Sequence, residues 1–194
     1  ARDGRVIQQW PVTPVDPESP PEPNASHGPL SVEIAPPVFS GQRIVCPTSR
    51  NEFVALDPCV GIVWSVQIEP PPMPRGPRNR ARAGRTANNW MRAEVVVAGD
   101  RVLATSPVDE HLHCLDARTG ERLWRMPCRG GLLVASVLGD KVLVVGESRV
   151  FCVRLEDGQS AWPADRAALP EGAAPLHRGW VDGTNYLLPL STAQ

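Results

Sequence analysis

Two histidines and two acidic residues stand together near the middle of the sequence. His111 and His113 are two positions apart, and Asp109 and Glu110 directly precede them. Side chains two positions apart on a β-strand point to the same face, so the two imidazoles could bind one metal ion. A zinc site needs further ligands and supporting hydrogen bonds, and the chain has only two other histidines. We therefore interpret the pair as histidines of a hydrated strand and predict no metal site.

The cysteines also carry no recognisable chemistry. Their odd number and the lack of a C-x-x-C pair predict neither a disulfide framework nor a zinc site. The sequence lacks a G-x-S-x-G nucleophile elbow and a glycine-rich phosphate loop, so we predict no catalytic residues. The five are Cys46, Cys59, Cys114, Cys128 and Cys152.

A proline-rich and arginine-rich segment separates Glu69 from Glu94. Arginine can bind phosphate or carboxylate through two parallel hydrogen bonds, so this cationic segment predicts an anionic partner. An acidic protein is favoured over nucleic acid because interleaved aromatic residues are missing. The alternative is a flexible loop in an arginine-rich chain, which has a single lysine. The candidate residues are Arg75, Arg78, Arg80, Arg82 and Arg85.

The composition of the 194-residue chain is that of a globular protein, with 42% hydrophobic residues and a net charge of −1. This charge excludes a global field that attracts nucleic acid or anionic membranes. The longest apolar run, from Gly131 to Gly146, contains Asp140 and Lys141, so no transmembrane segment is predicted. No targeting signal follows Ala1, and we expect the natural protein to start further upstream.

The strands that would position any such site are predicted by a pattern that recurs along the sequence. Four apolar runs each pass through a glycine into a second run, at Gly41, Gly99, Gly139 and Gly183. Glycine supplies the positive φ of a tight turn, and β-branched neighbours favour strands, so each run predicts a β-hairpin. The spacings of 58, 40 and 44 residues are close to the length of a four-stranded module.

A second pattern follows each of the first three hairpins. Residues 53–64, 112–124 and 150–162 each contain a strand, a glycine turn and a second strand that ends in tryptophan. Residues 1–7 match the turn at 117–123. Helical periodicity is broken by proline or glycine in every window of useful length. The sequence therefore predicts an all-β chain made of repeats.

The segment that ends at Trp124 resembles the tryptophan-docking repeat of pyrroloquinoline-quinone-like (PQQ-like) β-propellers, with the pattern A-x-D-x-x-T-G-x-x-x-W. Cys114 replaces the alanine of the pattern. The copy that ends at Trp162 has Arg154 in place of Asp and Asp157 in place of Thr, and the copy that ends at Trp64 is one residue short. The resemblance implies that each tryptophan packs on a glycine of the neighbouring blade. The blade-docking residues that it implies are Asp57, Gly61, Trp64, Asp116, Thr119, Gly120, Trp124, Gly158 and Trp162.

We therefore predict a partial β-propeller of four-stranded antiparallel blades, with about three blades and two partial ones. A ring of this kind closes with roughly four to eight blades, so the remaining blades of the same protein are expected partners. The layout is the end of a blade at residues 1–10, a proline-rich interblade loop at 11–31, blades at 32–68, 92–128 and 129–165, a Pro/Arg-rich insertion at 69–91, and a loop with the opening hairpin of a further blade at 166–194.

The resemblance also implies a function. Quinoprotein dehydrogenases of this superfamily bind PQQ and Ca²⁺, but their vicinal cysteines, calcium ligands and catalytic aspartate are not identifiable in this sequence. We expect a non-enzymatic scaffold that binds a protein or a small ligand, without a cofactor, in the bacterial periplasm or envelope. The alternatives are a fragment of a PQQ-dependent dehydrogenase that oxidises alcohols or sugars, and a sensory domain.

Overall fold

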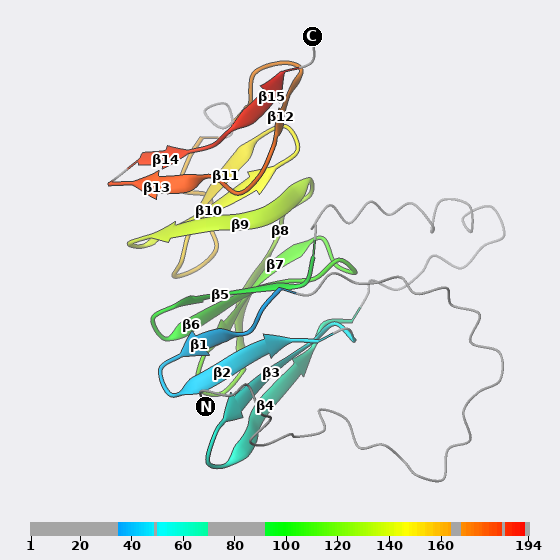
Figure 1. Cartoon of the computed structure of the whole chain (residues 1–194), viewed down its shortest axis with the longest axis vertical. Helices are drawn as coiled ribbons and strands as arrows, with labels where there is room; N and C mark the ends of the chain where they lie inside the picture. The colour runs from blue at the N-terminus through cyan, green and yellow to red at the C-terminus, as the bar shows by residue number, and fades with distance from the viewer. Residues whose placement is uncertain (1–34, 49, 70–91, 164–167, 184, 193–194) are drawn as a thin grey trace, which may run out of the picture.

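The computed structural model describes residues 35–48, 50–69, 92–163, 168–183 and 185–192 (Figure 1). The predicted blade end at 1–10, the loop at 11–31 and the arginine-rich segment at 70–91 lie outside these residues. Every regular element in the described part of the chain is a β-strand. This part therefore contains no helix that is long and apolar enough to cross a membrane.

Two of the sheets are complete four-stranded antiparallel meanders, which we call blades. In both, each strand pairs with the next strand in the chain. The prediction of an all-β chain with four-stranded blades is confirmed by these two sheets. The first blade contains β1 (Val38–Ser40), β2 (Arg43–Pro47), β3 (Glu52–Asp57) and β4 (Gly61–Gln67), and the second contains β5 (Glu94–Ala98), β6 (Arg101–Thr105), β7 (His111–Asp116) and β8 (Arg122–Pro127).

The third blade, predicted at 129–165, has three strands in the described residues, and positions 164–165 of this range lie outside them. It contains β9 (Gly131–Leu138), β10 (Lys141–Gly146) and β11 (Val150–Arg154). The expected fourth strand is reduced to a single bridge between Val153 and Ser160. Its tryptophan is followed at once by Pro163, which has no N–H to donate to a ladder, whereas two residues separate Trp124 from Pro127 in β8.

Two short ribbons follow the third blade. The predicted opening hairpin is present as β13 (Trp180–Asp182) and β14 (Asn185–Leu187). The second ribbon, of β12 (Ala173–Pro175) and β15 (Leu190–Thr192), was not predicted. Strands of three residues are too short to show an alternating pattern. The four hairpin glycines have φ values of 59° to 62°, as a tight turn requires.

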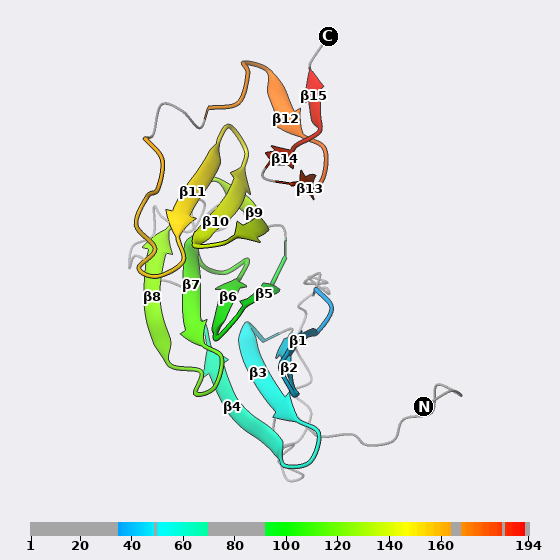
Figure 2. The same ribbon diagram turned by 90° about the vertical axis from the view of Figure 1, so that its left-hand side faces the viewer.

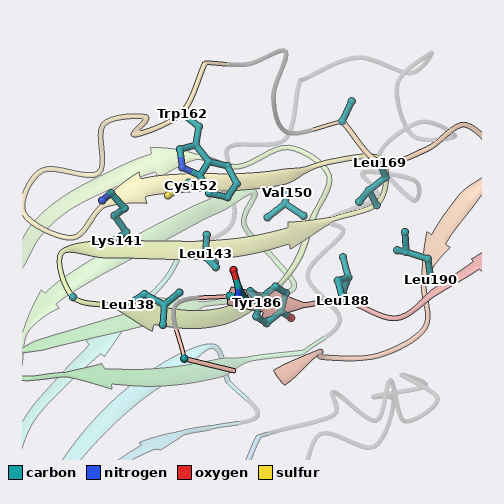
Figure 3. A pocket seen from close by; sticks show the side chains of 14 residues that line it. Leu138, Lys141, Leu143, Val150, Cys152, Trp162, Leu169, Tyr186, Leu188 and Leu190 are labelled. Carbon is teal, nitrogen blue, oxygen red and sulfur yellow. The ribbon is translucent and has the colours of Figure 1, made fainter. Parts of the chain in front are cut away.

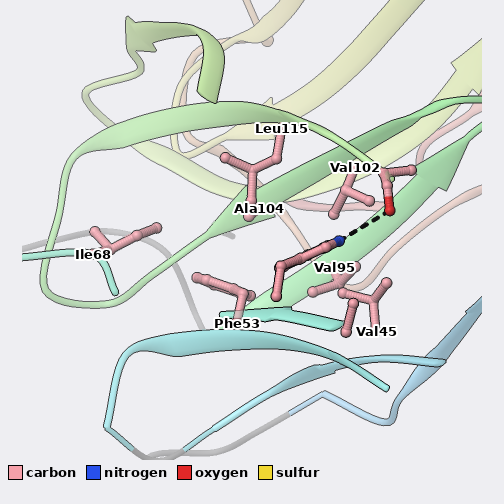
Figure 4. Packing of buried hydrophobic residues seen from close by; sticks show 10 residues of the cluster. Val45, Phe53, Ile68, Val95, Val102, Ala104 and Leu115 are labelled. Atoms are coloured by element: carbon pink, nitrogen blue, oxygen red, sulfur yellow. Dashed lines mark hydrogen bonds between the residues drawn. The ribbon is translucent and has the colours of Figure 1, made fainter. Parts of the chain in front are cut away.

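The sheets are stacked in chain order, and their hydrophobic core lies between them (Figure 1). The first strands β1, β5, β9 and β13 lie on one side of the stack, and β4 and β8 lie on the other (Figure 2). Successive side chains of β6 point in turn toward the two neighbouring blades. Val102 and Ala104 pack against the first blade (Figure 4), and Leu103 between them packs against the third. Each joint therefore buries one face of each of two neighbouring sheets.

Candidate functional site

The turn between β7 and β8 is the copy of the repeat motif that keeps Asp, Thr, Gly and Trp. The side chain of Asp116 accepts hydrogen bonds from the backbone N–H of Thr119 (2.8 Å) and of Arg118 (2.9 Å), and from the Thr119 hydroxyl (3.1 Å). These bonds, led by that of the Thr119 N–H, lower the pKa of Asp116. The turn closes at Gly120, whose N–H donates to the Asp116 carbonyl. The turn therefore presents its backbone in a fixed shape.

Trp64 of the first blade lies on this turn. A Cβ added to Gly120 would lie 2.7 Å from the Trp64 ring, so the ring rests directly on the glycine peptide. The indole N–H donates to the Ala117 carbonyl at 3.1 Å, which is the dashed bond in Figure 4. Trp64 is 7% exposed. The structure thus brings together two residues that the sequence places 56 positions apart.

The second and third blades meet in the same way. The ring of Trp124 would lie 2.7 Å from a Cβ on Gly158, and its indole N–H donates to the Leu155 carbonyl at 3.0 Å. The Asp157 side chain supports this turn by accepting from the Gln159 N–H at 3.0 Å. Asp157 stands where the motif has threonine, so a carboxylate at this position also holds the turn.

A pair of arginines adds a second contact at each joint. The Arg43 guanidinium donates to the Arg118 carbonyl at 2.7 Å and to the Ala117 carbonyl at 3.5 Å. Arg101 donates to the carbonyls of Leu155 (3.1 Å) and Glu156 (2.9 Å). Sequence reasoning missed these two residues. The signal was present, because each is the second residue after a hairpin glycine.

We expect Arg101→Ala to lower the free energy of unfolding by about 1 to 2 kcal/mol, because two carbonyls lose a charged donor at a partly buried joint. Urea denaturation of the two proteins measures the difference. Arg125→Ala is the matched control, since Arg125 is exposed on β8, and its effect should stay within about 0.5 kcal/mol. Equal losses in the two variants would show that Arg101 does not stabilise the joint.

Trp162 is not placed on a glycine in the described part of the chain. It is 38% exposed, and a Cβ on either Gly172 or Gly183 would meet no atom within 4 Å. Trp162 instead borders a hollow of about 800 Å³ beside the third blade (Figure 3). Lys141 lies on the same hollow, and Tyr186 of β14 closes another side of it.

The first blade also carries two of the predicted docking residues on its own outer turn. Asp57 accepts hydrogen bonds from the N–H groups of Cys59 (2.8 Å) and Val60 (3.3 Å). Gly61 follows with a φ of 97°. This turn repeats the Asp116 turn in a shorter form. It lies at the start of β4, and Asp57 borders the same shallow hollow as Ala117 and Arg118 of the second blade's turn.

The two histidines of β7 do lie together, but around a carboxylate. Asp109 binds the His111 Nδ1 at 2.6 Å and the His113 Nε2 at 2.7 Å. Within the described ranges no group of three potential ligands is arranged to hold a metal ion. The expectation of a hydrated pair is wrong for His113, which is 2% exposed. His113 pairs with Ala104 across β6 and β7, and Ala104 packs against the first blade, so His113 lies on the face of β7 that is turned toward that blade.

This cluster predicts an acid-labile fold. Burial lowers the pKa of His113 and outweighs the opposing bond to Asp109. For Asp109, burial raises the pKa, but the hydrogen bonds and charges of both histidines together lower it. In each case the unfolded chain binds the proton more tightly, so stability rises with pH. Stability should fall as the pH drops below about 6.5 for His113, and again below about 3.9 for Asp109.

Urea denaturation between pH 8 and pH 5 measures the histidine contribution. His113→Gln should flatten the profile over this range, because it removes the buried titrating group. His177→Gln is the control, since His177 is exposed and should leave the profile unchanged. A profile that keeps its slope in His113→Gln would contradict the assignment.

The three buried cysteines, Cys114, Cys128 and Cys152, are structural in this arrangement. All five are free thiols. Burial raises the pKa of Cys114 to about 11 and that of Cys128 to about 12, so both stay protonated near neutral pH. Burial also raises the pKa of Cys152, which occupies the place of Cys114 in the third blade. A protonated thiol is a poor nucleophile and metal ligand.

Stacked antiparallel blades joined through a tryptophan and a glycine turn define a β-propeller repeat protein. Residues 61–179, more than half of the chain, match the model of a family described as outer membrane protein assembly factor BamB. The chain therefore belongs to this family of PQQ-like repeat proteins. A comparison with curated proteins found no match.

Several solved structures are similar to this chain at low sequence identity. BamB from Moraxella catarrhalis is similar with a TM-score of 0.55 and 16% identity, over 77% of this chain and 40% of that one. The chain thus spans less than half the length of that protein. The computationally designed Ika4 protein has a TM-score of 0.51 and 11% identity, over 84% and 93% of the two chains. A europium-containing methanol dehydrogenase has a TM-score of 0.47 and 21% identity, over 65% and 23%.

Proposed function

We propose that the chain is part of a non-enzymatic PQQ-like propeller that serves as a binding scaffold in the bacterial envelope. The observation that carries this proposal is the match of residues 61–179 to a family described as an outer membrane assembly factor. The fold similarity to BamB from Moraxella catarrhalis supports the same choice. Because the family is described as an assembly factor for outer membrane proteins, we expect a protein partner.

The hydrogen bonds and the protonation of the reactive side chains also support a scaffold. The Asp116 carboxylate is occupied by the N–H groups of its own turn, and Asp109 is occupied by two imidazoles. The buried thiols of Cys114 and Cys128 stay protonated. These groups stabilise turns and joints, and they are not aimed at a common reacting atom.

Exposed apolar side chains are a surface that a protein partner could cover. Trp180 is 55% exposed and Val181 is 41% exposed on β13, and Phe39 on β1 is 72% exposed. All three belong to first strands of their sheets, which lie on one side of the stack (Figure 2). Aromatic residues are enriched at protein interfaces, so this side is a candidate binding face.

Because the arginine-rich segment is cationic, we expect the partner to present an acidic surface. We expect the combined substitution Arg78→Ala, Arg80→Ala and Arg82→Ala to weaken binding to an envelope partner and to reduce its dependence on salt. Surface plasmon resonance at two or more salt concentrations measures both quantities. An unchanged affinity and salt slope would remove the arginine segment from the interface.

A dye-reduction assay separates the scaffold from the dehydrogenase alternative. The full-length natural protein is incubated with PQQ and Ca²⁺, and reduction of an electron-accepting dye is followed with alcohols and aldoses. We expect no reduction above the rate without protein. Turnover of any of these substrates would identify a quinoprotein dehydrogenase and end the scaffold proposal.

A further inference from the structure

The hollow of about 800 Å³ lies between the third blade and the strands that follow it (Figure 3). Strands β10 and β11 form one wall, and residues between Gly183 and Leu190 form the opposite wall. The preceding joint is filled, because Val134 of the eight-residue strand β9 packs with Leu103 and Cys114 of the second blade. Strand β14 has only three residues and leaves space. The volume is within the range of small-molecule sites, roughly 300 to 1,000 Å³.

The interior of the hollow is apolar and uncharged. Leu143 and Cys152, which are 4% and 2% exposed, are the most buried of its lining residues. Burial raises the pKa of the Cys152 thiol, so this side chain stays neutral near pH 7. Four further leucines come from both walls, namely Leu138, Leu169, Leu188 and Leu190. Such a surface favours an aliphatic group, which it removes from water.

One charged side chain lines the hollow among the residues that the structure describes. The Lys141 side chain is 50% exposed, so its ammonium group lies at the rim and not in the buried interior. Its ion-pair partner is the Asp140 carboxylate, 3.7 Å away, which is 76% exposed and outside the lining. An ion pair in water is weak, so Lys141 can bind a second anion. The described lining contains no acidic side chain that would repel one.

We propose that this hollow binds a small amphiphilic anion, namely an aliphatic chain that ends in a carboxylate. The chain lies between Leu143 on the third blade and Leu188 on the opposite wall, and the carboxylate accepts hydrogen bonds from the Lys141 Nζ. The lysine ammonium is a compact charge with three donors, which suits a head group at a hydrated rim. The ligand occupies the space between two sheets of this chain, so the site needs no further repeat.

Decanoate is the probe, used at neutral pH below its critical micelle concentration with the 194-residue chain. Isothermal titration calorimetry gives its affinity and its stoichiometry. Acetate carries the same head group without the chain, and decyltrimethylammonium carries the same chain with the opposite charge. We expect one decanoate per chain and no measurable binding of acetate. Decyltrimethylammonium should bind at least about tenfold more weakly, because Lys141 repels it.

A labelling experiment locates the bound head group, because Lys141 is the single lysine of the chain. Sulfosuccinimidyl acetate acylates Lys141 and the N-terminal amine, and mass spectrometry gives the two rates separately. At a decanoate concentration ten times its dissociation constant, acylation of Lys141 should slow about tenfold by mass action. Acylation of the N-terminal amine should not change.

Two pairs of variants separate the charge from the apolar wall. Lys141→Gln should weaken decanoate binding about fivefold, whereas Arg125→Gln, which removes an exposed charge on β8, should leave it unchanged. Leu188→Asn should weaken binding about tenfold, because it places an amide that must lose its water in the apolar wall. Leu187→Asn is its control, since Leu187 is 41% exposed and outside the lining.

Four results would overturn the proposal. They are no binding of millimolar decanoate, binding of several decanoates per chain without one dominant site, equal affinity for decyltrimethylammonium, and decanoate binding that leaves the acylation of Lys141 unchanged. All four are measured on the unaltered protein, so they decide the matter even if a variant folds poorly. The outcome does not depend on the proposed scaffold function, because neither a protein partner nor an enzyme substrate is present.

Discussion

Trp64→Ala is expected to lower the free energy of unfolding by about 3 to 5 kcal/mol, as large aromatic deletions in a core do. The ring is 7% exposed and lies on the Gly120 peptide between the first and second blades. Its removal leaves a cavity at the centre of a joint and takes the indole donor from the Ala117 carbonyl. Urea or guanidinium denaturation followed by far-UV circular dichroism measures the loss.

Two further variants separate the parts of this effect. Trp64→Phe keeps an aromatic ring but not the indole N–H, and we expect it to cost about 1 to 2 kcal/mol. Trp162→Ala deletes the same residue type at a joint that is open, and it should cost no more than about 1 kcal/mol. If Trp162→Ala costs as much as Trp64→Ala, the stabilisation does not come from docking between blades.

The contrast between Trp64 and Trp162 also shows which features the sequence could predict. Hairpin turns follow from glycine at fixed spacing, and the turn at Asp116 follows from an aspartate side chain that accepts hydrogen bonds from the backbone N–H groups two and three residues further on. Such features depend on neighbours in the chain, so a repeated pattern identifies them. The fold class was predictable for the same reason, because a module that recurs must bury its faces against its own copies.

Contacts between distant residues were harder to predict. Arg43 reaches carbonyls 74 and 75 positions away, and a backbone carbonyl leaves no signature in the sequence. His113 lies on the face of β7 that is turned toward the first blade, and nothing in the local sequence shows that this face is covered. Likewise, the short strands β12 and β15 pair across 14 to 18 intervening residues, and neither shows a pattern of its own.

The third blade illustrates how one residue changes a repeat. Its turn keeps Gly158 at positive φ, and Trp124 docks on it, so the joint forms as the repeat predicts. In the described residues, the place of β8 is taken by a single bridge between Val153 and Ser160, and Pro163 directly after Trp162 has no N–H to donate to a ladder. Local agreement with a motif therefore predicts the docking turn better than it predicts the strand that follows.

Gly120→Ala is expected to lower the free energy of unfolding by about 3 kcal/mol, from two separate causes. A φ of 75° is strained for any residue with a side chain, which costs about 1 kcal/mol. The added Cβ would also lie 2.7 Å from Trp64 Cδ2, and this atom belongs to the rigid part of a buried ring. The ring must move off the turn, and its bond to Ala117 is then strained or lost.

Gly99→Ala separates the two causes because it shares only the first. Its φ is 62°, and a Cβ there would meet no atom within 4 Å. We expect Gly99→Ala to lower the free energy of unfolding by about 1 kcal/mol, which is the effect of backbone strain alone. The difference between the two variants, measured by urea denaturation, is the cost of disturbing the docked indole. In a Trp64→Ala background the ring is gone, so Gly120→Ala should fall to the Gly99→Ala value, and a loss that stays near 3 kcal/mol would show that the indole is not the cause.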